Sequence, residues 1–302
     1  LNAQQAPQYS HYVFNQFQLN PAVAGTKQCL DLRFGFRNQW AGFEDGPKTQ
    51  FGSMNTRLGR SKKKGSPWHA IGIKFETDQA ARFSQSLVQA AYAYHFKMGR
   101  EMNASFGIFL GFNQYKVDLE GITQVGPNPS IQDPVLLDAS QKSFLFPEVS
   151  PGFWMHNKKF YLGLSVKHAT GNPILNDNEA SEARLIQHLN FTTGYAYTIG
   201  QKTNFIPSLR VGYASGVPLG IDVNGMLDYD RRLALGLGYR NGDALIGLMK
   251  VNFLNYFTLG YAYDFTLSDA KALSGSTHEV ILGISVCPGQ TSGRYNPCAA
   301  YD

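Results

Sequence analysis

Long apolar runs are missing from this 302-residue sequence: no stretch approaches the roughly 18 consecutive apolar residues that a membrane-spanning helix needs. The helical patterns of about 10 to 15 residues that alternate with strands in α/β proteins are missing as well. Charged residues are scarce, at 16% of the chain against about 25% in an average soluble domain. No apolar signal core is present, so we expect Leu1 to lie at or near a processed end. These shortages exclude a helical membrane protein and an α/β fold.

Aromatic residues and glycine are abundant instead. Aromatics make up 13% of the chain, and glycine contributes 31 residues. A β-barrel wall uses aromatics in girdles at the membrane interfaces, and glycine where strands bend or face a crowded lumen. The net charge of +5 comes without a basic helix or a nucleic-acid-binding motif. We interpret the basic run from Arg60 to Lys64 as a solvated turn or a contact with lipid phosphates.

The clearest strand runs from Met102 to Tyr115. Its residues alternate between apolar side chains and side chains that are mostly small or polar. A period of two residues indicates a β-strand with two different faces. The segment is longer than the roughly five or six residues of a usual globular strand, and it is long enough to cross a bilayer at a tilt, which takes about 9 to 11. We therefore interpret it as a transmembrane strand.

From the first cysteine onward the chain contains fourteen such segments, separated by turn residues. They are residues 29–40, 48–59, 68–77, 83–97, 102–115, 143–156, 158–168, 184–199, 204–214, 219–230, 232–241, 243–253, 255–266 and 277–287. The second alternates poorly, and Pro147 and Pro151 interrupt the sixth, where we expect a bulge or an irregular wall. An even number of strands is typical of bacterial single-chain barrels.

The lengths of the connections indicate the same topology. Those after odd-numbered strands include 41–47, 116–142, 169–183 and 267–276, of which the last three are the longest, whereas those after even-numbered strands, such as 98–101, are mostly short. Short periplasmic turns and long outer loops are typical of outer-membrane barrels with both termini inside. Backbone groups cannot stay unpaired in hydrocarbon, so strands span only as closed barrels. We predict an all-β protein of the bacterial outer membrane, a closed antiparallel transmembrane β-barrel of about 14 strands.

In such a barrel the apolar faces of the strands point to lipid and the polar faces point into the lumen. The predicted lumen carries charges of both signs, which suits internal ion pairing better than a selective pore. Its charged residues are Asp31, Arg33, Arg37, Lys74, Glu76, Lys167, Arg210, Asp222, Asp228, Arg240, Lys250 and Glu279.

The first 28 residues differ from the strands. Tyr9, Tyr12, Val13 and Phe17 have helical spacing, and Asn-Pro and Gly signals follow them, so we expect a short amphipathic helix. Its apolar face needs cover, and the segment either plugs the lumen or underlies the barrel. The chain then divides into an N-terminal periplasmic or lumenal segment, the outer-membrane barrel and a C-terminal periplasmic tail, at residues 1–28, 29–287 and 288–302.

No catalytic or metal site stands out in the sequence. None of the seven histidines forms a helical metal pair or lies beside a cysteine pair with zinc spacing. Oxygen-bearing side chains in one predicted outer loop could bind calcium, and a polar exposed loop explains them equally well: Asn172, Asn176, Asp177, Asn178 and Glu179. We predict a non-enzymatic protein with no catalytic residues, no metal, no cofactor and no nucleic-acid partner.

The three cysteines suggest a disulfide. Cys29 begins the first predicted strand and Cys287 ends the last, and these strands become neighbours when the barrel closes. Both cysteines have the parity of the lumenal face. We predict a disulfide between them, with Cys298 in the tail as a competing partner. Such a bond fits the oxidising periplasm.

Two groups of residues near the ends of the chain form a combined signature. The first consists of Gln5, Gln8, Tyr9, Tyr12, Phe14, Asn15, Asn20, Pro21, Ala22, Ala24, Gly25, Arg37, Gln39, Trp40, Gly46 and Pro47. The second consists of Tyr261 to Ser268, including Asp264, and of Gly275, Ser276, His278 and Glu279. Together they closely resemble the PorP/SprF family of Bacteroidetes, and they bracket nearly the whole chain.

The resemblance implies an outer-membrane barrel of the type IX secretion system, which serves protein secretion and gliding motility. Our first hypothesis is a barrel that anchors or helps export a secreted surface protein, such as a cell surface adhesin, through the C-terminal domain of that cargo. The outer loops at 116–142 and 169–183 would hold the cargo, since loops on a rigid wall often carry recognition. The implied partners are the cargo, type IX translocon or periplasmic components, and outer-membrane lipid.

Two other functions fit the same pattern. The first is a transporter or porin for small molecules, in which the N-terminal segment acts as a plug. The second is a structural subunit that links the barrel to a periplasmic motor or ring through residues 1–28 and the turn at Lys62–Lys64.

Overall fold

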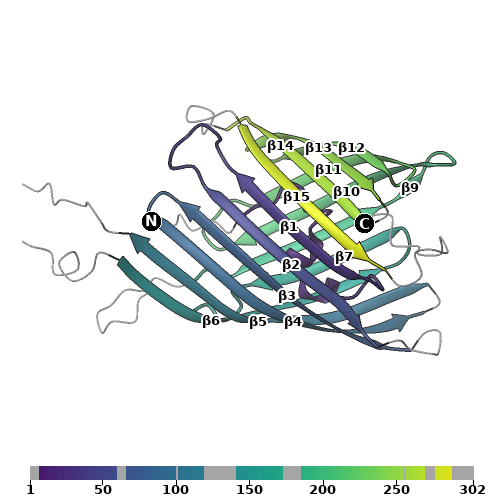
Figure 1. Ribbon diagram of the computed structural model, residues 1–302, viewed down its shortest axis with the longest axis horizontal. Coiled ribbons are helices and arrows are strands. Elements are labelled where there is room, and N and C mark those ends of the chain that lie inside the picture. The colour runs from purple at the N-terminus through teal and green to yellow at the C-terminus, as the bar shows by residue number, and fades with distance from the viewer. Residues whose placement is uncertain are drawn as a thin grey trace, which may run out of the picture.

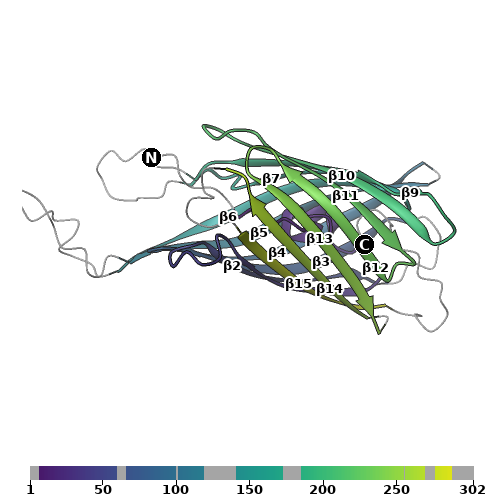
Figure 2. The same ribbon diagram turned by 90° about the horizontal axis from the view of Figure 1, so that it is seen from above.

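A computed structural model describes residues 7–59, 66–99, 101–118, 141–172, 185–254, 256–268 and 276–287. The strands wrap into a tilted barrel, and the N-terminal segment lies inside the ring (Figures 1 and 2). Within these ranges, no helix has the length and apolar character needed to cross a membrane. Some predicted features lie outside the described residues: most of both long outer loops, four of the calcium candidates at 176–179, the basic turn at 60–64, and the tail 288–302 with Cys298.

The wall consists of one continuous antiparallel sheet that closes on itself. Neighbours in the ring follow chain order, β15 pairs with β1, and β10 pairs with β11. β8 and β9 both pair with β10 and occupy one wall position, so the 15 strands make 14 positions, as predicted. The strands are β1 (Leu30–Asn38), β2 (Lys48–Leu58), β3 (Trp68–Ala80), β4 (Phe83–Met98), β5 (Met102–Asp118), β6 (Gln141–His156), β7 (Phe160–Lys167), β8 (His188–Tyr195), β9 (Tyr197–Thr198), β10 (Thr203–Ala214), β11 (Gly220–Tyr229), β12 (Leu233–Arg240), β13 (Ala244–Phe253), β14 (Phe257–Thr266) and β15 (Ser276–Val286).

The alternation of side chains decides which face meets lipid. On β1, Phe34 and Phe36 are 44% and 43% exposed, while Arg33 and Arg37 are 4% and 2% exposed. The predicted lumenal charges are all buried except Lys167, which is half-buried. The prediction of an apolar outer face and a charged lumen is therefore confirmed.

The wall position predicted over 184–199 is shorter than expected and is interrupted. Ala196 separates β8 from β9 and is buried, and its N–H donates to the carbonyl of Lys159 at 2.7 Å, next to the β7–β8 pairing, whereas the pairing with β10 stops at Gly194. The pairing with β10 resumes at Tyr197. Tyr195 and Ala196 thus lack pairing with β10, which splits the wall position without opening the ring.

The two prolines of β6 do not cause the expected bulge, because its pairing with β5 is unbroken along the strand. The carbonyl of Val149 accepts a hydrogen bond from the N–H of Ala169 at 3.0 Å, on the β7 side. In an antiparallel sheet the N–H and C=O groups of one residue point to the same side of the strand. Pro147 and Pro151 are each two residues from Val149, so the N–H groups that they lack would face β7 and not β5. There β6 pairs with β7 over five residues. The irregular wall therefore lies between β6 and β7.

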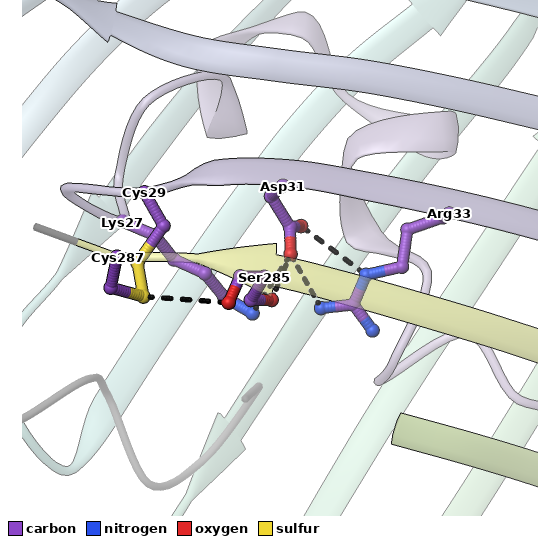
Figure 3. The surroundings of a disulfide bond; sticks show 6 residues. All are labelled: Lys27, Cys29, Asp31, Arg33, Ser285 and Cys287. Atoms are coloured by element: carbon purple, nitrogen blue, oxygen red, sulfur yellow. Dashed lines mark hydrogen bonds and ion pairs between the residues drawn. A yellow bond between two sulfur atoms is a disulfide. The ribbon is translucent and has the colours of Figure 1, made fainter. Parts of the chain in front are cut away.

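The predicted disulfide joins Cys29 and Cys287 where the barrel closes (Figure 3). Beside it, the carboxylate of Asp31 accepts hydrogen bonds from Arg33 Nε at 3.2 Å and from Ser285 Oγ at 2.6 Å. Chain termini of outer-membrane barrels lie on the periplasmic side. This end of the barrel is therefore periplasmic, and the connection between β1 and β2 lies at the outer end.

The N-terminal segment is less helical than predicted. It contains the four-residue helix α1 (Gln16–Leu19) and the 3₁₀ helix η1 (Pro21–Val23), whereas residues 10–15 form turns. Residues 9–18 are all buried, polar and apolar alike. The expectation of an amphipathic helix was wrong because the wall surrounds this segment, so that it has no solvent-facing side.

Candidate functional site

The lumen is occupied by residues 9–25, which we call the plug. All of them are buried except the half-buried Leu19. Aromatic rings of the plug pack on aromatic rings of the wall: Tyr9 meets Phe51 edge-on at 4.7 Å between ring centroids, and Phe17 lies 5.3 Å from Phe109. Such pairs stabilise a contact beyond the area they bury. The plug is therefore packed like a protein core.

Asn20 fixes the turn of the plug and attaches it to the wall. Its Oδ1 accepts a hydrogen bond from the N–H of Ala22 at 3.0 Å, which caps η1, and Pro21 starts that helix with a suitable φ. Its Nδ2 donates to the carbonyls of Phe153 at 2.9 Å and Leu164 at 3.0 Å. One amide thus joins the plug to β6 and β7.

The plug backbone touches the wall directly at a glycine of β5. A Cβ added to Gly107 would lie 2.5 Å from the nitrogen of Ala22 and 2.6 Å from the carbonyl carbon of Pro21. Next to it, Ser105 Oγ donates to the carbonyl of Ala22 at 2.7 Å. At the end of the plug, Gly25 has a φ of +64°, which favours glycine. Gly107 and Gly25 therefore allow the close approach of the plug to the wall.

A charged clamp holds the outer half of the plug. Arg37 lies between two carboxylates, 3.0 Å from Asp264 and 3.2 Å from Glu279, and donates to Ser10 Oγ at 2.7 Å. Glu279 also accepts from the backbone N–H groups of Ser10 and His11, at 2.9 and 3.0 Å. Charge-assisted hydrogen bonds of this kind are among the stronger ones in proteins. The clamp ties β1, β14 and β15 to the plug.

Arg240 extends this clamp toward β11. It donates to Asp222 at 2.7 Å, to Asp264 at 3.2 Å and to Ser10 Oγ at 3.1 Å. The Ser10 hydroxyl donates in turn to Asp264 at 2.6 Å. Asp222 accepts a further bond from Arg210 at 2.7 Å. Basic and acidic groups alternate along this chain, so each buried charge has an opposite neighbour.

A second charged group lies beside Tyr9. The Tyr9 hydroxyl donates to Glu76, and the Lys167 ammonium lies 2.7 Å from the same carboxylate. Lys74 Nζ donates to the carbonyl of Gln18 at 2.7 Å. Two wall lysines and one wall carboxylate thus meet the middle of the plug.

The plug itself is electrically neutral. It contains no Asp, Glu, Lys or Arg. Burial, with Lys250 nearby, lowers the pKa of His11 to about 4, and burial together with Glu76 raises the pKa of Tyr9 well above its usual value. Burial also raises the pKa of Tyr12. A neutral plug therefore satisfies a charged wall through backbone and side-chain dipoles.

Described residues border two cavities next to the plug. The larger, of about 60 Å³, lies toward the outer end between the plug and β3, β7, β8 and β10. The smaller, of about 20 Å³, lies toward the periplasmic end and is bordered by Asp31, Arg33 and Asn55. The plug therefore leaves room for a few waters or small groups at each end.

The structure brings most of the predicted signature residues together. Gln8 borders the larger cavity, and the plug contains Tyr9, Tyr12, Phe14, Asn15, Asn20, Pro21, Ala22 and Gly25. Arg37, Asp264 and Glu279 meet in the clamp.

Other signature residues lie apart from the plug, among them Gln39, Trp40 and His278. Gln39 and Trp40 are in the β1–β2 connection, where the Trp40 N–H donates to Thr277 Oγ1 at 3.1 Å. His278 follows the lumenal Thr277 on β15 and so lies on its opposite face, with its Nδ1 2.8 Å from the Tyr261 hydroxyl.

Sequence reasoning missed the role of Ser10, which connects both arginines of the clamp. A serine beside a tyrosine has no distinguishing pattern, so no local signal could have identified it.

Metal binding has no support in the described residues, where no group of three or more His, Cys, Asp or Glu could hold an ion. Asn172 is the one calcium candidate within that part of the chain. Its Nδ2 donates to the carbonyl of Pro147 and to Thr170 Oγ1.

An antiparallel barrel with an apolar outer face and a charged, plugged lumen defines a bacterial outer-membrane protein. A family model described as "Type IX secretion system membrane protein PorP/SprF" matches residues 1–284. The chain belongs to the PorP/SprF family, which confirms the resemblance found in the sequence. Family and fold are those of a secretion or transport membrane protein and not of a known enzyme class. No curated protein matches the sequence.

Several solved barrels have a similar fold. The toluene transporter TbuX of Ralstonia pickettii is 10% identical, with a TM-score of 0.51 over 91% of this chain and 93% of that chain. The toluene transporter TodX of Pseudomonas putida is 8% identical, with a TM-score of 0.51 over 94% and 95%. The monoaromatic hydrocarbon channel CymD is 11% identical, with a TM-score of 0.50 over 90% and 91%. At these identities the likeness concerns the fold alone.

Proposed function

We propose that this barrel is a non-enzymatic holder for a secreted protein of the type IX system. It anchors an adhesin-type cargo, or assists its export, by binding the cargo's C-terminal domain at the outer end of the barrel. The family ties the chain to type IX secretion. The assignment to cargo holding rests on the plug. A barrel whose lumen is filled by a segment bonded to its wall suits a scaffold better than a channel.

The energetics of the plug support this role. Buried charged residues on β1, β3, β12, β14 and β15 form hydrogen bonds with the plug, namely Arg37, Glu76, Arg240, Asp264 and Glu279. Removing the plug would leave these buried charged groups without the hydrogen bonds that it provides, which costs about 1–3 kcal/mol or more for each unsatisfied group. A rigid, filled barrel presents its outer loops at fixed positions, and such loops are suited to recognition.

The test is purification of the tagged protein from its native membrane in mild detergent, followed by mass spectrometry of the proteins that co-purify. We expect a large secreted protein, alone or with translocon subunits. Deleting the predicted outer-loop segments 119–140 and 173–184 together should remove that protein from the eluate. A control deletion within 269–275, in another connection at the outer end, should leave it bound.

Two results would contradict the proposal. The first is recovery of the barrel without any secreted protein or translocon subunit. The second is equal cargo recovery and surface retention after the paired loop deletion, which would move the interface away from these loops. Retention of the Cys29–Cys287 disulfide on non-reducing gels checks that the deletion variant closes its barrel.

Small-molecule transport is the second candidate, favoured by the similar fold of the toluene transporters TbuX and TodX. Single-channel recording distinguishes the two. A scaffold should be closed in its intact form and should conduct when Gly107→Leu forces the plug backbone away from β5. Gly247→Ala is the matched control, because its new Cβ would meet no atom nearer than 3.9 Å. Appreciable conductance of the unmodified barrel would favour a transporter.

A further inference from the structure

The larger lumenal cavity is a basic one. It is bordered by three basic side chains, Lys74, Lys167 and Arg210, and by one carboxylate, Glu76. The plug contributes Tyr9 and other residues to its wall. Leu189, Tyr213, Val217 and Pro218 border it toward the β10–β11 connection, which lies at the outer end of the barrel.

Two of the three cations already have acidic partners. Lys167 is 2.7 Å from Glu76, and Arg210 is 2.7 Å from Asp222. Among the ion pairs of the described residues, none involves Lys74. The three basic side chains that border the cavity therefore outnumber the two carboxylates that pair with them, Glu76 and Asp222.

The surroundings of Lys74 use only part of the hydrogen-bonding capacity of its ammonium group. The residue is 3% exposed, donates one hydrogen bond to the carbonyl of Gln18, and lies over the ring of Phe109 at 4.3 Å from its centroid. An ammonium has three N–H donors, and a buried charge ordinarily has an ionic partner or several hydrogen bonds. Lys74 thus retains donor capacity beside a cavity.

The size of the cavity fits a small acidic group. A cavity needs a volume of about 10–15 Å³ to hold one water. The cavity volume of about 60 Å³ therefore accommodates a carboxylate with a short stem. Other hydrogen-bonding side chains border the same space, namely Gln8, His188 and Asn190. A monoanion entering from the outer end would meet the buried Lys74 ammonium and neutral polar groups, while the one carboxylate of the lining, Glu76, is already bonded to Lys167 and Tyr9.

We propose that this cavity binds one carboxylate of a partner polypeptide, with Lys74 as its ionic partner. The inference rests on the proposed function, because it assigns to the cargo a free C-terminal carboxylate or an acidic side chain that enters the outer end of the lumen. The same chemistry would accept a free small anion such as acetate, and the experiment separates these sources.

The experiment uses saturation-transfer difference NMR on the full-length barrel in detergent. The probes are N-acetyl-trialanine with a free C-terminal carboxylate, the corresponding C-terminal amide, N-acetyl-Ala-Asp-Ala amide, and sodium acetate. We expect saturable binding of one or both peptides that carry a carboxylate, and none of trialanine amide. Lys74→Met should weaken that binding about tenfold or more, since a charge-assisted bond is lost.

Two further variants keep the result interpretable. Lys74→Gln retains a donor for the Gln18 carbonyl and replaces Lys74→Met if the latter does not fold. Lys202→Met removes a lysine whose side chain is 60% exposed at a periplasmic turn, and binding should be unchanged. Binding of trialanine amide as tight as that of the carboxylate peptides, binding of acetate with no peptide, or full binding by both Lys74 variants would overturn the proposal.

The two proposals can fail separately. If a secreted protein co-purifies with the barrel but its recovery does not change in Lys74→Gln, the carboxylate site is wrong and the holding function stands. If carboxylate peptides bind through Lys74 but no secreted protein or translocon subunit co-purifies, the cavity stands and the holding function is wrong.

Discussion

Replacing Arg37 with methionine removes the centre of the charged clamp. Arg37, Asp264 and Glu279 have side chains that are 3%, 3% and 0% exposed, so little water can replace the lost guanidinium. Methionine has a similar length and can fill the space without a charge. The change leaves two carboxylates near each other, with Arg240 still on Asp264 and the N–H groups of Ser10 and His11 still on Glu279.

The size of the effect follows from these contacts. Two charge-assisted bonds to carboxylates, of about 1.5–3 kcal/mol each, are lost together with the bond to Ser10 Oγ, and breaking a buried pair by removing one partner costs about 3–5 kcal/mol. We expect Arg37→Met to lower the free energy of unfolding by about 3–5 kcal/mol. Arg37→Lys should lose less, because it keeps the charge but cannot bridge both carboxylates in the way a planar guanidinium does.

The assay is reversible urea unfolding in detergent, followed by tryptophan fluorescence with the disulfide intact. The matched control is Asp230→Asn, which breaks exposed pairs with Lys202 and Arg232; the side chains of Asp230, Lys202 and Arg232 are 35%, 60% and 82% exposed. Exposed pairs contribute about 0–1 kcal/mol, so the control should stay close to the unmodified protein. Combining Arg37→Met with Glu279→Gln should cost less than the sum of the two single changes, because the double variant no longer leaves a carboxylate without its cation.

A free energy of unfolding of Arg37→Met within about 1 kcal/mol of that of the Asp230→Asn control would contradict this expectation. That result would mean that the clamp contributes no more than a surface pair, and that apolar packing alone retains the plug.

Three other predictions concern the seam and the plug. Cys29→Ser with Cys287→Ser should lower the free energy of unfolding by up to about 5 kcal/mol in urea titrations, because the disulfide closes a separation of 258 residues; no change would contradict this. The pKa of His11 is lowered to about 4 by burial, so stability should be full above about pH 6.5 and fall progressively down to about pH 4; a His11→Gln variant with an equally steep loss over this window would refute it. Asn20→Asp keeps the cap of η1 but loses both Nδ2 donors to wall carbonyls, and should cost about 2–3 kcal/mol in the same titration, whereas an unchanged midpoint would show that the wall contact is dispensable.

Much of the wall could be predicted because its pattern is local. A lipid-facing residue such as Phe34 alternates with a lumenal one such as Arg33, and a strand of period two records that difference in the sequence. The even strand count and the alternation of loop lengths then gave the topology. Closure brought Cys29 next to Cys287, so their disulfide was predictable from the order of the strands.

The interior was less predictable because it depends on contacts between distant residues. The spacing of Tyr9 and Tyr12 predicted an amphipathic helix, whereas the wall encloses the segment and favours turns. Prolines in β6 predicted a bulge or an irregular wall; the pairing with β5 is unbroken, and the irregular wall lies on the side where pairing with β7 is short.

The sequence by itself determined the barrel, its lumenal charges and its family, since each is recorded in local alternation or in a motif. Only the tertiary structure decided that the neutral plug lies in the lumen and that Ser10 joins Arg37 to Arg240. It also decided that Lys74, which forms no ion pair among the described residues, borders a cavity. These contacts join residues far apart along the chain. Their energies depend on burial and on partner geometry, which local sequence patterns do not record.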